Sequence, residues 1–303
     1  MNNNSIILSV IVPCFNSGIF LMECIDSIVS SKINSCVEVI IVDDGSTDNI
    51  TIHTLEKCMS LDNIVVERLQ CNHGVQYARN IGIAKSNGKF LMTLDSDDKI
   101  NNNIDGGSYI DEAVKVLETD DDVAFVHCYS EMFGEYSGMT ISSYPLNESL
   151  ILSKHHVPTS IIYRKSDLVT GDNYLIGVKK WQDWSFGVKI LGNRWTKNLA
   201  NKIYSITKPH HQYRVHSKWL RISYSNINEY EMTLMTIMDS IVYFQYFWGM
   251  ESAEEIAKTV ISMKPSKVDE LCRIANHDVG LARKIIRERK FRLVSSNVGN
   301  QIP

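Results

Sequence analysis

The chain lacks the long apolar run that a membrane-spanning helix requires. Its richest apolar stretch, residues 237–250, is interrupted by Asp239 and Gln245 and falls short of the roughly 20 apolar residues that cross a bilayer. The first residues carry no basic segment, and the apolar run at residues 6–12 is short, so we expect no signal peptide. These absences predict a cytoplasmic protein.

Paired cysteines and an excess of positive charge are missing as well. The seven cysteines form no CxxC pair, and such an odd, scattered set is typical of reduced thiols rather than of a disulfide framework. The formal net charge is −4 over 303 residues, so no overall positive field would attract nucleic acid. With 44% apolar and 22% charged residues, the composition is that of a globular protein.

Residues 6–130 alternate between two hydrophobic periods. Apolar, β-branched runs predict strands at 8–12, 37–42, 64–69, 90–94 and 123–128, and helical spacing predicts helices at 21–29, 52–59, 76–86 and 111–119. Alternation of strands and helices with short loops indicates an α/β fold, with parallel strands and right-handed crossovers. Strands that are apolar on both faces agree, because helices cover both sides of such sheets.

The rest of the chain is less regular and then becomes helical. We expect strands near 160–163 and 203–206 and a helix at 183–191, followed by helices at 230–248, 253–263 and 266–292. We therefore predict a domain at 1–225, in two halves (1–130 and 131–225), and a C-terminal helical extension at 226–303. The Met- and aromatic-rich segment 230–248 is expected to form helix–helix core rather than a ligand groove.

Three carboxylates follow the fourth predicted strand within four residues: Asp95, Asp97 and Asp98. Like charges repel, so folding alone gives no reason to gather them, whereas a hard cation such as Mg²⁺ or Mn²⁺ takes oxygen ligands. Ligands of open α/β sheets bind just past the carboxyl ends of strands. These residues predict a metal site, with Asp95 and Asp97 on one side of the strand. The alternative is a solvated acidic turn that caps a helix.

Two further strand ends belong to the same predicted edge of the sheet. Asp43 and Asp44 end the second strand, where a carboxylate could accept hydrogen bonds from a base or a ribose; the alternative is an Asp-Gly turn with Asp48 capping the next helix. In the first strand, Pro13 is expected to stop the ladder. Phe15 then lies where a base could stack, unless it folds back on the core.

Together these segments resemble family 2 glycosyltransferases of the GT-A fold. The resemblance rests on four ordered motifs, which are Ser9-Val10-Ile11-Val12-Pro13-Cys14-Phe15-Asn16, Val42-Asp43-Asp44-Gly45-Ser46-Thr47-Asp48, Asn72-His73-Gly74-Val75 with Ala78-Arg79-Asn80-Ile81-Gly82, and Leu94-Asp95-Ser96-Asp97-Asp98. It covers about residues 6–130. It implies a Rossmann-like, mostly parallel sheet flanked by helices, with a nucleotide-binding first half and an acceptor-binding second half.

The resemblance also implies roles for single residues. Asp44 would bind the base, Asp95 the ribose and Asp97 the metal ion, with Asp98 nearby. Arg79 would hold the nucleotide or its diphosphate, a task that suits a planar guanidinium; the alternative is a surface arginine on a helix. The full set of implied donor contacts is Pro13, Phe15, Asn16, Asp43, Asp44, Arg79, Asp95, Ser96 and Arg214.

An inverting transfer needs a general base to take the proton of the acceptor hydroxyl. Family members carry a Glu-Asp or similar pair at a helix start in the second half, where this chain has Gln182-Asp183. Gln182 departs from the usual Glu, but Asp183 is kept as the expected base. Trp181 and Trp184 could stack on sugar faces and lower the local dielectric. The alternative is that Asp183 only caps the helix.

The run Tyr213-Arg214-Val215-His216 matches a Tyr-Arg-x-His pattern that the family often has. The resemblance implies that His216 completes the metal shell, with His210 or His211 as substitutes, and that Arg214 faces the diphosphate. Imidazole suits Mn²⁺ better than Mg²⁺. A purely structural histidine is the alternative.

The predicted function is therefore metal-dependent, inverting transfer of a sugar from a UDP-sugar donor. The implied acceptor is a glycan or lipid-linked glycan, as in synthesis of a bacterial surface polysaccharide, and the implied ion is Mn²⁺ or Mg²⁺. A metal-dependent nucleotidyl or phosphoryl transferase is one alternative, although no GxxxxGK[ST] loop is present. A non-catalytic nucleotide-sugar binding module is another. A Rossmann dehydrogenase is disfavoured because the first strand ends in Pro13-Cys14-Phe15-Asn16 rather than in GxGxxG.

Residues 264–292 hold nine Lys or Arg against four acids, a local balance of +5. A mixed basic and apolar helix of this kind could lie on an anionic membrane, at the inner face of the cell membrane where a lipid-linked acceptor would be. The alternative, which we favour, is a solvated helix that packs its apolar side on the main domain. The oligomeric state is not indicated by the sequence.

Overall fold

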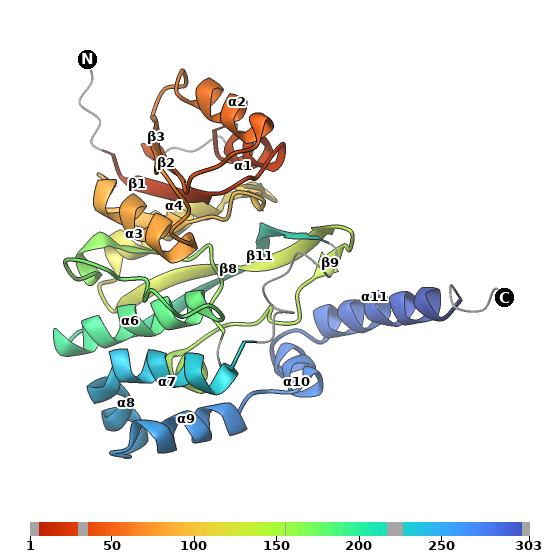
Figure 1. Cartoon of the computed structure of the whole chain (residues 1–303). Helices are drawn as coiled ribbons and strands as arrows, with labels where there is room; N and C mark the ends of the chain where they lie inside the picture. The colour runs from red at the N-terminus through yellow and green to blue at the C-terminus, as the bar shows by residue number, and fades with distance from the viewer. Residues whose placement is uncertain (1–5, 30–35, 155, 217–226, 299–303) are drawn as a thin grey trace.

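The computed structural model describes residues 6–29, 36–154, 156–216 and 227–298. Its centre is one mixed sheet, crossed by chain segments from both halves of the sequence (Figure 1). The strand order is β3 (Ile64–Arg68), β2 (Val37–Asp43), β1 (Leu8–Cys14), β4 (Phe90–Thr93), β10 (Ile162–Arg164), β8 (Val123–Gly134), β11 (Lys202–Val215) and β5 (Lys99–Ile100). The short strand β9 (Gly138–Met139) pairs with β8, and β6 (Asn103–Ile104) pairs with β7 (Gly107–Ser108).

Helices cover the sheet and continue beyond it. They are α1 (Phe20–Val29), α2 (Asn49–Cys58), α3 (Val75–Lys85), α4 (Tyr109–Thr119), α5 (Glu148–Lys154), α6 (Gln182–Thr196), α7 (Glu229–Asp239), α8 (Ile241–Trp248), α9 (Ala253–Ser262), α10 (Lys267–His277) and α11 (Val279–Val298). The predicted α/β fold with C-terminal helices is confirmed. The strands β1, β2, β3 and β4 pair in parallel, as do β8 and β11, whereas β10 runs antiparallel to β4 and β8, β5 to β11, and β9 to β8.

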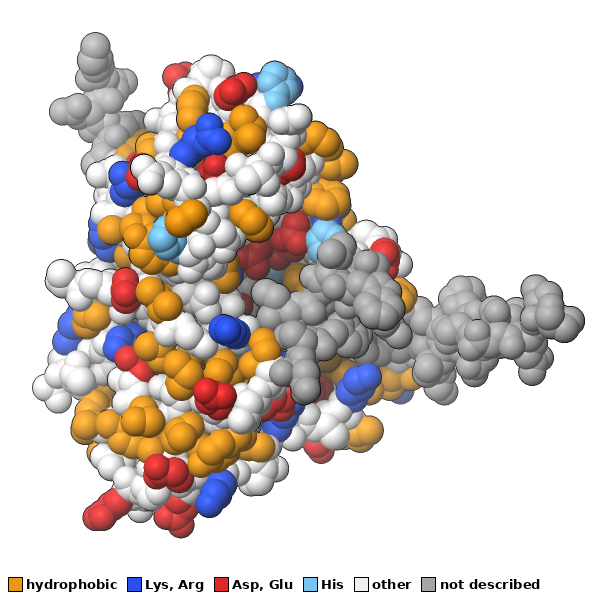
Figure 2. Space-filling model, viewed as in Figure 1, with side chains coloured by type: hydrophobic (Ala, Val, Ile, Leu, Met, Phe, Trp, Pro, Cys, Tyr) orange, Lys and Arg blue, Asp and Glu red, His pale blue; other side chains and the backbone are white. Residues whose placement is uncertain are grey.

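Strand ends from the first half of the chain form one rim. β1 pairs in parallel with β2 on one side and β4 on the other, so all three end at the same edge. The expectation that Pro13 stops the ladder is wrong: β1 continues to Cys14 along β2. Pairing with β4 already ends at Ile11, so the missing N–H of Pro13 breaks no bond on that side. Figure 2 shows acidic side chains gathered at a hollow beside a histidine.

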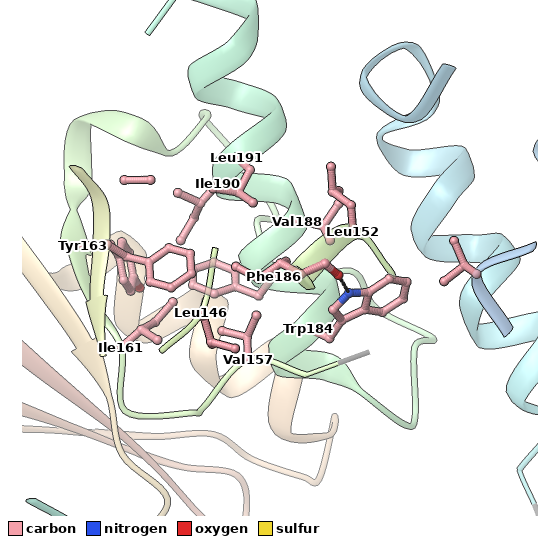
Figure 3. Close-up of a cluster of buried hydrophobic side chains, with 14 of the residues drawn as sticks. Leu146, Leu152, Val157, Ile161, Tyr163, Trp184, Phe186, Val188, Ile190 and Leu191 are labelled. Carbon is pink, nitrogen blue, oxygen red and sulfur yellow. Dashed lines mark hydrogen bonds between the residues drawn. The ribbon is translucent and has the colours of Figure 1, made fainter. Parts of the chain in front are cut away.

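The core below the rim is aromatic. Phe186 of α6 is 1% exposed and stacks on Tyr174, with ring centroids 4.0 Å apart and planes at 4°. Tyr163 of β10 meets the same phenyl ring edge-on at 5.1 Å. Figure 3 shows Tyr163 and Phe186 among aliphatic side chains of α6 and of the segment 146–161, with Trp184 at the far side of the cluster. This packing fixes the start of α6 against the sheet.

The C-terminal helices join this core. Ile237, Phe244, Ile256 and Ile285 are fully buried in the same cluster as Phe186, which confirms core packing for the 230–248 segment. Figure 1 shows α7 and α9 in layers beyond α6, and α11 pointing away from the body. No helix in the described ranges is long and apolar enough to cross a membrane. The division at residue 225 stays a prediction.

The predicted single helix at 266–292 is two helices. α10 ends at His277 and α11 begins at Val279, and the carboxylate of Asp278 between them accepts a hydrogen bond from the Leu281 N–H at 2.9 Å. An aspartate in this position starts a new helix because it satisfies a free N–H of the first turn. The side chains of Arg289, Lys290 and Arg292 lie outside the described residues, so the basic stretch is described only as far as residue 288.

Candidate active site

Two of the predicted residues brace the loops at this rim: Asn16 ties the loop after β1 to the loop after β2, and Asp43 ties the loop after β2 to β3. Asn16 has a left-handed backbone (φ 49°), and its side-chain oxygen accepts from the N–H groups of Thr47 and Asp48 at 2.8 and 3.2 Å. Asp43 is fully buried and accepts from the Ser46 N–H at 2.9 Å and from Arg68 Nε at 3.2 Å. These contacts leave the Phe15 side chain 47% exposed at the rim. The alternative in which Phe15 folds into the core is wrong.

Asp44 joins the loop after β2 to the start of α3. Its two oxygens accept from the N–H groups of His73 and Gly74 at 2.8 and 2.7 Å. Gly74 has φ 97° and precedes the first residue of α3, a conformation that favours glycine. Each carboxylate oxygen keeps a second lone pair, so base recognition by Asp44 stays a prediction. Asp48 caps α2 through the Thr51 N–H, as expected.

The acids after β4 have separate partners. Asp95 accepts from Arg79, and Ser96 bonds to the hydroxyl of Ser17 at 2.6 Å. The strand ends at Thr93, so side-chain alternation does not extend to Asp95 and Asp97. The alternative of a helix-capping turn is wrong, because strand β5 follows at Lys99–Ile100 and no helix starts there.

Asp97 and Asp98 each meet a histidine of β11 or its end. His216 Nε2 lies 2.6 Å from Asp97 Oδ2, and His211 Nε2 lies 2.9 Å from Asp98 Oδ2. Asp98 is 1% exposed, and its other oxygen accepts from the Arg214 N–H at 2.7 Å. Burial raises the pKa of Asp98 to about 6, against the opposing effect of His211. Burial, reinforced by Asp95, also raises the pKa of Asp97.

The Arg214 side chain contacts two aromatic rings, a carboxylate and a backbone carbonyl of the fold. Its guanidinium lies between the rings of Phe20 and Phe133, 4.3 Å from each centroid. It pairs with Glu23 at 2.7 Å and donates from Nε to the Asp97 carbonyl at 2.7 Å. Arg214 therefore braces the loop that carries Asp97, and its predicted contact with the diphosphate stays a prediction. His210, a predicted substitute ligand, is buried and bonds to the Asn101 carbonyl.

Arg79 connects the acidic rim to the predicted base. It is 2% exposed, which excludes the surface-arginine alternative. Its Nη2 donates to Asp95 Oδ1 at 2.7 Å and its Nη1 to Asp183 Oδ1 at 3.1 Å. Burial opposes the charge, but Asp183 and Asp95 raise the pKa of Arg79 above its usual value. The guanidinium is thus a fixed cation between two acids from distant parts of the chain.

Asp183 lies in the first turn of α6, at the wall of a cavity of about 390 Å³. Its Oδ2 accepts from the Thr159 hydroxyl at 3.1 Å, and the start of α6 has no side-chain cap bond, so the capping alternative is wrong. Burial raises the pKa of Asp183, and Arg79 opposes that rise. The cavity is lined by Arg79, Asp95, Ser130, Thr140, Ser142, His156, Val157, Pro158, Thr159, Lys179, Lys180, Trp181, Gln182, Asp183, Trp184, His211 and Tyr213.

The two tryptophans beside Asp183 differ. Trp184 is 1% exposed, and its indole N–H donates to the Ile151 carbonyl at 2.6 Å, the dashed line of Figure 3. Stacking of Trp184 on a sugar is therefore wrong, although its ring makes that side of the cavity less polar. Trp181 holds a left-handed backbone (φ 60°, ψ 35°) just before α6, which costs about 1–3 kcal/mol for such a residue. Lys180 and Lys264 lie 5.3 and 5.0 Å from its ring centroid.

The side chains near Asp97 could hold a divalent ion if substrate phosphates supplied the remaining ligands. Among the described residues no group of three or more His, Cys, Asp or Glu side chains could hold a metal ion by itself. Asp97, whose side chain is 36% exposed, and His216 supply one carboxylate and one imidazole. Mg²⁺ in particular is commonly held by one or two carboxylates together with substrate phosphates. Asp98 is less suited, because both of its oxygens already accept hydrogen bonds.

Three groups with a role here were missed from the sequence. Thr159 bonds to Asp183, Glu23 pairs with Arg214, and Tyr174 lies under Arg79 with its ring centroid 4.9 Å from the guanidinium carbon. Each is far in sequence from its partner and lies outside any motif. No signal in one sequence indicates them.

Comparison with known proteins gives a consistent result. The family model described as "Glycosyl transferase family 2" matches residues 9–169. Glycosyltransferase GlyG of Streptococcus pneumoniae is 35% identical over 125 residues, covering 41% of this chain and 40% of that protein. Poly(ribitol-phosphate) beta-N-acetylglucosaminyltransferase TarS of Staphylococcus aureus is 36% identical over 108 residues, covering 34% of this chain and 19% of that protein. The chain thus spans less than half the length of either relative.

A solved structure shares the fold. The crystal structure of S. aureus TarS 1–349 in complex with UDP-GlcNAc has a TM-score of 0.65 and 23% sequence identity, and it covers 85% of this chain and 72% of that one. At this identity the likeness concerns the fold, which agrees with the sheet and C-terminal helices described above.

Proposed function

Because the chain belongs to glycosyltransferase family 2, we propose that it transfers a sugar from a UDP-sugar donor to a hydroxyl of a glycan or lipid-linked glycan, with inversion and with help from a divalent ion. UDP-GlcNAc is the first donor to test, since it is the ligand named for the TarS structure. Synthesis of a bacterial surface polysaccharide is the expected setting, since the named substrate of TarS is poly(ribitol-phosphate).

One observation carries the proposal: a rim acid and the predicted base share one cavity and one cation. Asp95 and Asp183 both line the 390 Å³ cavity, and Arg79 bonds to both. A donor held by its ribose at Asp95 would therefore present its sugar to the side where Asp183 lies. If Asp95 and Asp183 lay in separate pockets, the donor could bind but its sugar could not reach the base.

The side chains divide the work as follows. Phe15 and Asp44 would meet the base of the nucleotide, and Asp95 its ribose. Asp183 would accept the proton of the attacking hydroxyl as that oxygen bonds to the anomeric carbon from the face opposite the departing UDP. A divalent ion held by Asp97 and His216, when bound, would neutralise charge that grows on the diphosphate.

The acceptor would enter beside Trp181. Lys179, Lys180 and Trp181 line the cavity next to Asp183, and Lys180 is held by Glu229 of α7 at 2.7 Å. An aromatic face with flanking cations suits a sugar chain that carries negative groups. Lys264, between α9 and α10, also pairs with Glu229, at 2.8 Å, so the C-terminal part of the chain holds Lys180 of this wall in place.

We also propose that the protein works in the cytoplasm. The apolar side of α11 packs on the core through the buried Ile285, as the favoured alternative expects, and its exposed basic side is the part that would meet the inner face of the cell membrane. Arg283, Lys284 and Arg287 of α11 are exposed, and a basic helix of this kind is attracted to anionic lipid. Vesicle sedimentation with and without anionic lipid tests this part separately. Equal binding to neutral vesicles would contradict it.

Product analysis on a panel of nucleotide sugars tests the main proposal. A transferase releases UDP and adds one sugar to the acceptor, with inverted configuration at the anomeric carbon. A nucleotidyl transferase would instead move the UMP group and release a sugar 1-phosphate, and a transferase of the sugar phosphate would release UMP. A binding module would leave every donor intact, and that result, with donor binding retained, would overturn the proposal.

A further inference from the structure

Arg79 makes contacts that do not fit a simple phosphate ligand. It is 2% exposed, and both terminal nitrogens are engaged with carboxylates from distant parts of the chain. Its third nitrogen, Nε, is buried and has no hydrogen-bond partner among the described residues. The Tyr174 ring, itself stacked on Phe186, packs against the guanidinium. The group is held from below by the core and from the side by two acids.

We propose that Arg79 is the positioning residue of the base Asp183: it orients the carboxylate toward the cavity and keeps it in the anionic form that can accept a proton. The inference rests on the proposed function, because it assumes that Asp183 is the base. It assigns to Arg79 a task other than holding the donor diphosphate. Asp95 would be coupled to the base through the same guanidinium.

The geometry supports orientation first. Arg79 Nη1 binds Asp183 Oδ1 and the Thr159 hydroxyl binds Oδ2, so both oxygens are fixed and the carboxylate cannot rotate freely. An ionised carboxylate has about four acceptor positions, which leaves lone pairs for the acceptor hydroxyl. Arg79 Nη2 binds Asp95 at the same time. A single ammonium could not reproduce this fork, since lysine offers one nitrogen where arginine offers two terminal nitrogens, Nη1 and Nη2.

Electrostatics supports the second part. The titratable and charged groups that face Asp183 are Arg79 from α3, Asp95 after β4, His211 from β11 and Tyr174 from the loop before α6; Lys179, Lys180 and His156 complete the cavity wall. Burial and Asp95 raise the pKa of Asp183, whereas Arg79 and His211 lower it. Without Arg79, two half-buried acids would lie at the same cavity with no cation between them. One of them would then hold a proton near neutral pH.

The pH dependence of kcat/KM tests the inference, because its acidic limb reports the base of the free enzyme. Wild type must first transfer sugar; if it does not, the proposed function fails and the role of Arg79 is not at issue. For Arg79→Gln we expect the acidic limb to move up by about 1–3 pH units. Activity should be lost at low pH and partly recovered at high pH. Arg79→Lys keeps the charge and should give a smaller displacement.

Lys85→Gln is the matched control. It removes a cation from the same helix, but Lys85 is exposed and pairs with Glu67 at 2.9 Å, so its pH profile should equal that of wild type. If Arg79→Gln does not fold, the acidic limb of the kcat/KM profile of Arg79→Lys is the test, and it should still lie at higher pH than that of wild type. Asp95→Asn gives an independent test in the opposite direction. Asp95 raises the pKa of Asp183, so its removal should move the acidic limb of the pH profile to lower pH. A folded Arg79 variant that loses the same fraction of activity at every pH would overturn the inference.

Discussion

Replacement of Asp183 by asparagine is the sharpest change that can be made at this site. The two side chains have the same shape, so the asparagine can still accept from Arg79 through its carbonyl oxygen. Its amide group can in turn donate to the Thr159 hydroxyl, which now accepts instead of donating. The bond from Arg79 to Asp95 is not touched. The variant should therefore fold as wild type does and retain the donor side of the site.

Its effect should fall on the chemical step alone. A positioned general base contributes about 10²–10⁴-fold to the rate, which corresponds to about 3–5 kcal/mol of transition-state stabilisation. The amide cannot accept a proton near neutral pH, so that whole contribution should be lost. We expect kcat to fall by this factor, while the dissociation constant for UDP changes by less than about threefold.

Two measurements separate these effects. UDP release with acceptor present gives kcat, and titration calorimetry with UDP gives donor affinity. Asp172→Asn makes the same chemical change on an exposed loop residue and should leave both values at the wild-type level. The reasoning is refuted if Asp183→Asn retains more than about a tenth of wild-type kcat, or if its UDP affinity falls as much as its rate.

Two stability predictions follow from packing. Phe186→Ala removes a ring that is 1% exposed and contacts both Tyr174 and Tyr163, so the free energy of unfolding in urea should drop by about 3–5 kcal/mol; a loss below about 1 kcal/mol would contradict the packing. Gly82→Ala would place its Cβ 2.3 Å from Ile11 Cγ2, and we expect about 1–3 kcal/mol of overpacking cost to exceed the gain of about 1 kcal/mol in helix propensity. A rise in stability would show that α3 shifts without penalty.

Much of the first half of the fold was predictable because β1, β2 and β4 are apolar runs buried on both faces; β3 is half-exposed. The run at 90–94 is too short for a helix and is predicted as a strand, and the structure confirms a strand that ends at Thr93. The antiparallel position of β10 between β4 and β8 could not be predicted. A strand of three residues is too short for its sequence to indicate which strands it pairs with or in which direction. The break between α10 and α11 had a signal, the N-capping Asp278, but helical periodicity continues across it.

The sequence indicated which residues belong to the site but not which of them contact one another. The motifs indicated Asp95, Asp97 and Asp183, and the cavity brings Asp95 and Asp183 together. Burial of Arg79 between them depends on where α3 crosses β1, which is a tertiary property. Likewise, Trp184 faces the core because α6 docks through Phe186 and its neighbours. Helical spacing alone could not tell which of the two tryptophans stays at the cavity mouth.

Metal dependence of transfer tests the central claim most directly. Purified protein stripped with EDTA should release no UDP from its donor in the presence of acceptor, and added Mn²⁺ should restore the rate. Asp97→Asn should require about tenfold more Mn²⁺ or higher for half-maximal rate. Full activity of the stripped protein, with an Asp97→Asn variant that behaves as wild type, would contradict a rim of acids that works through a bound ion.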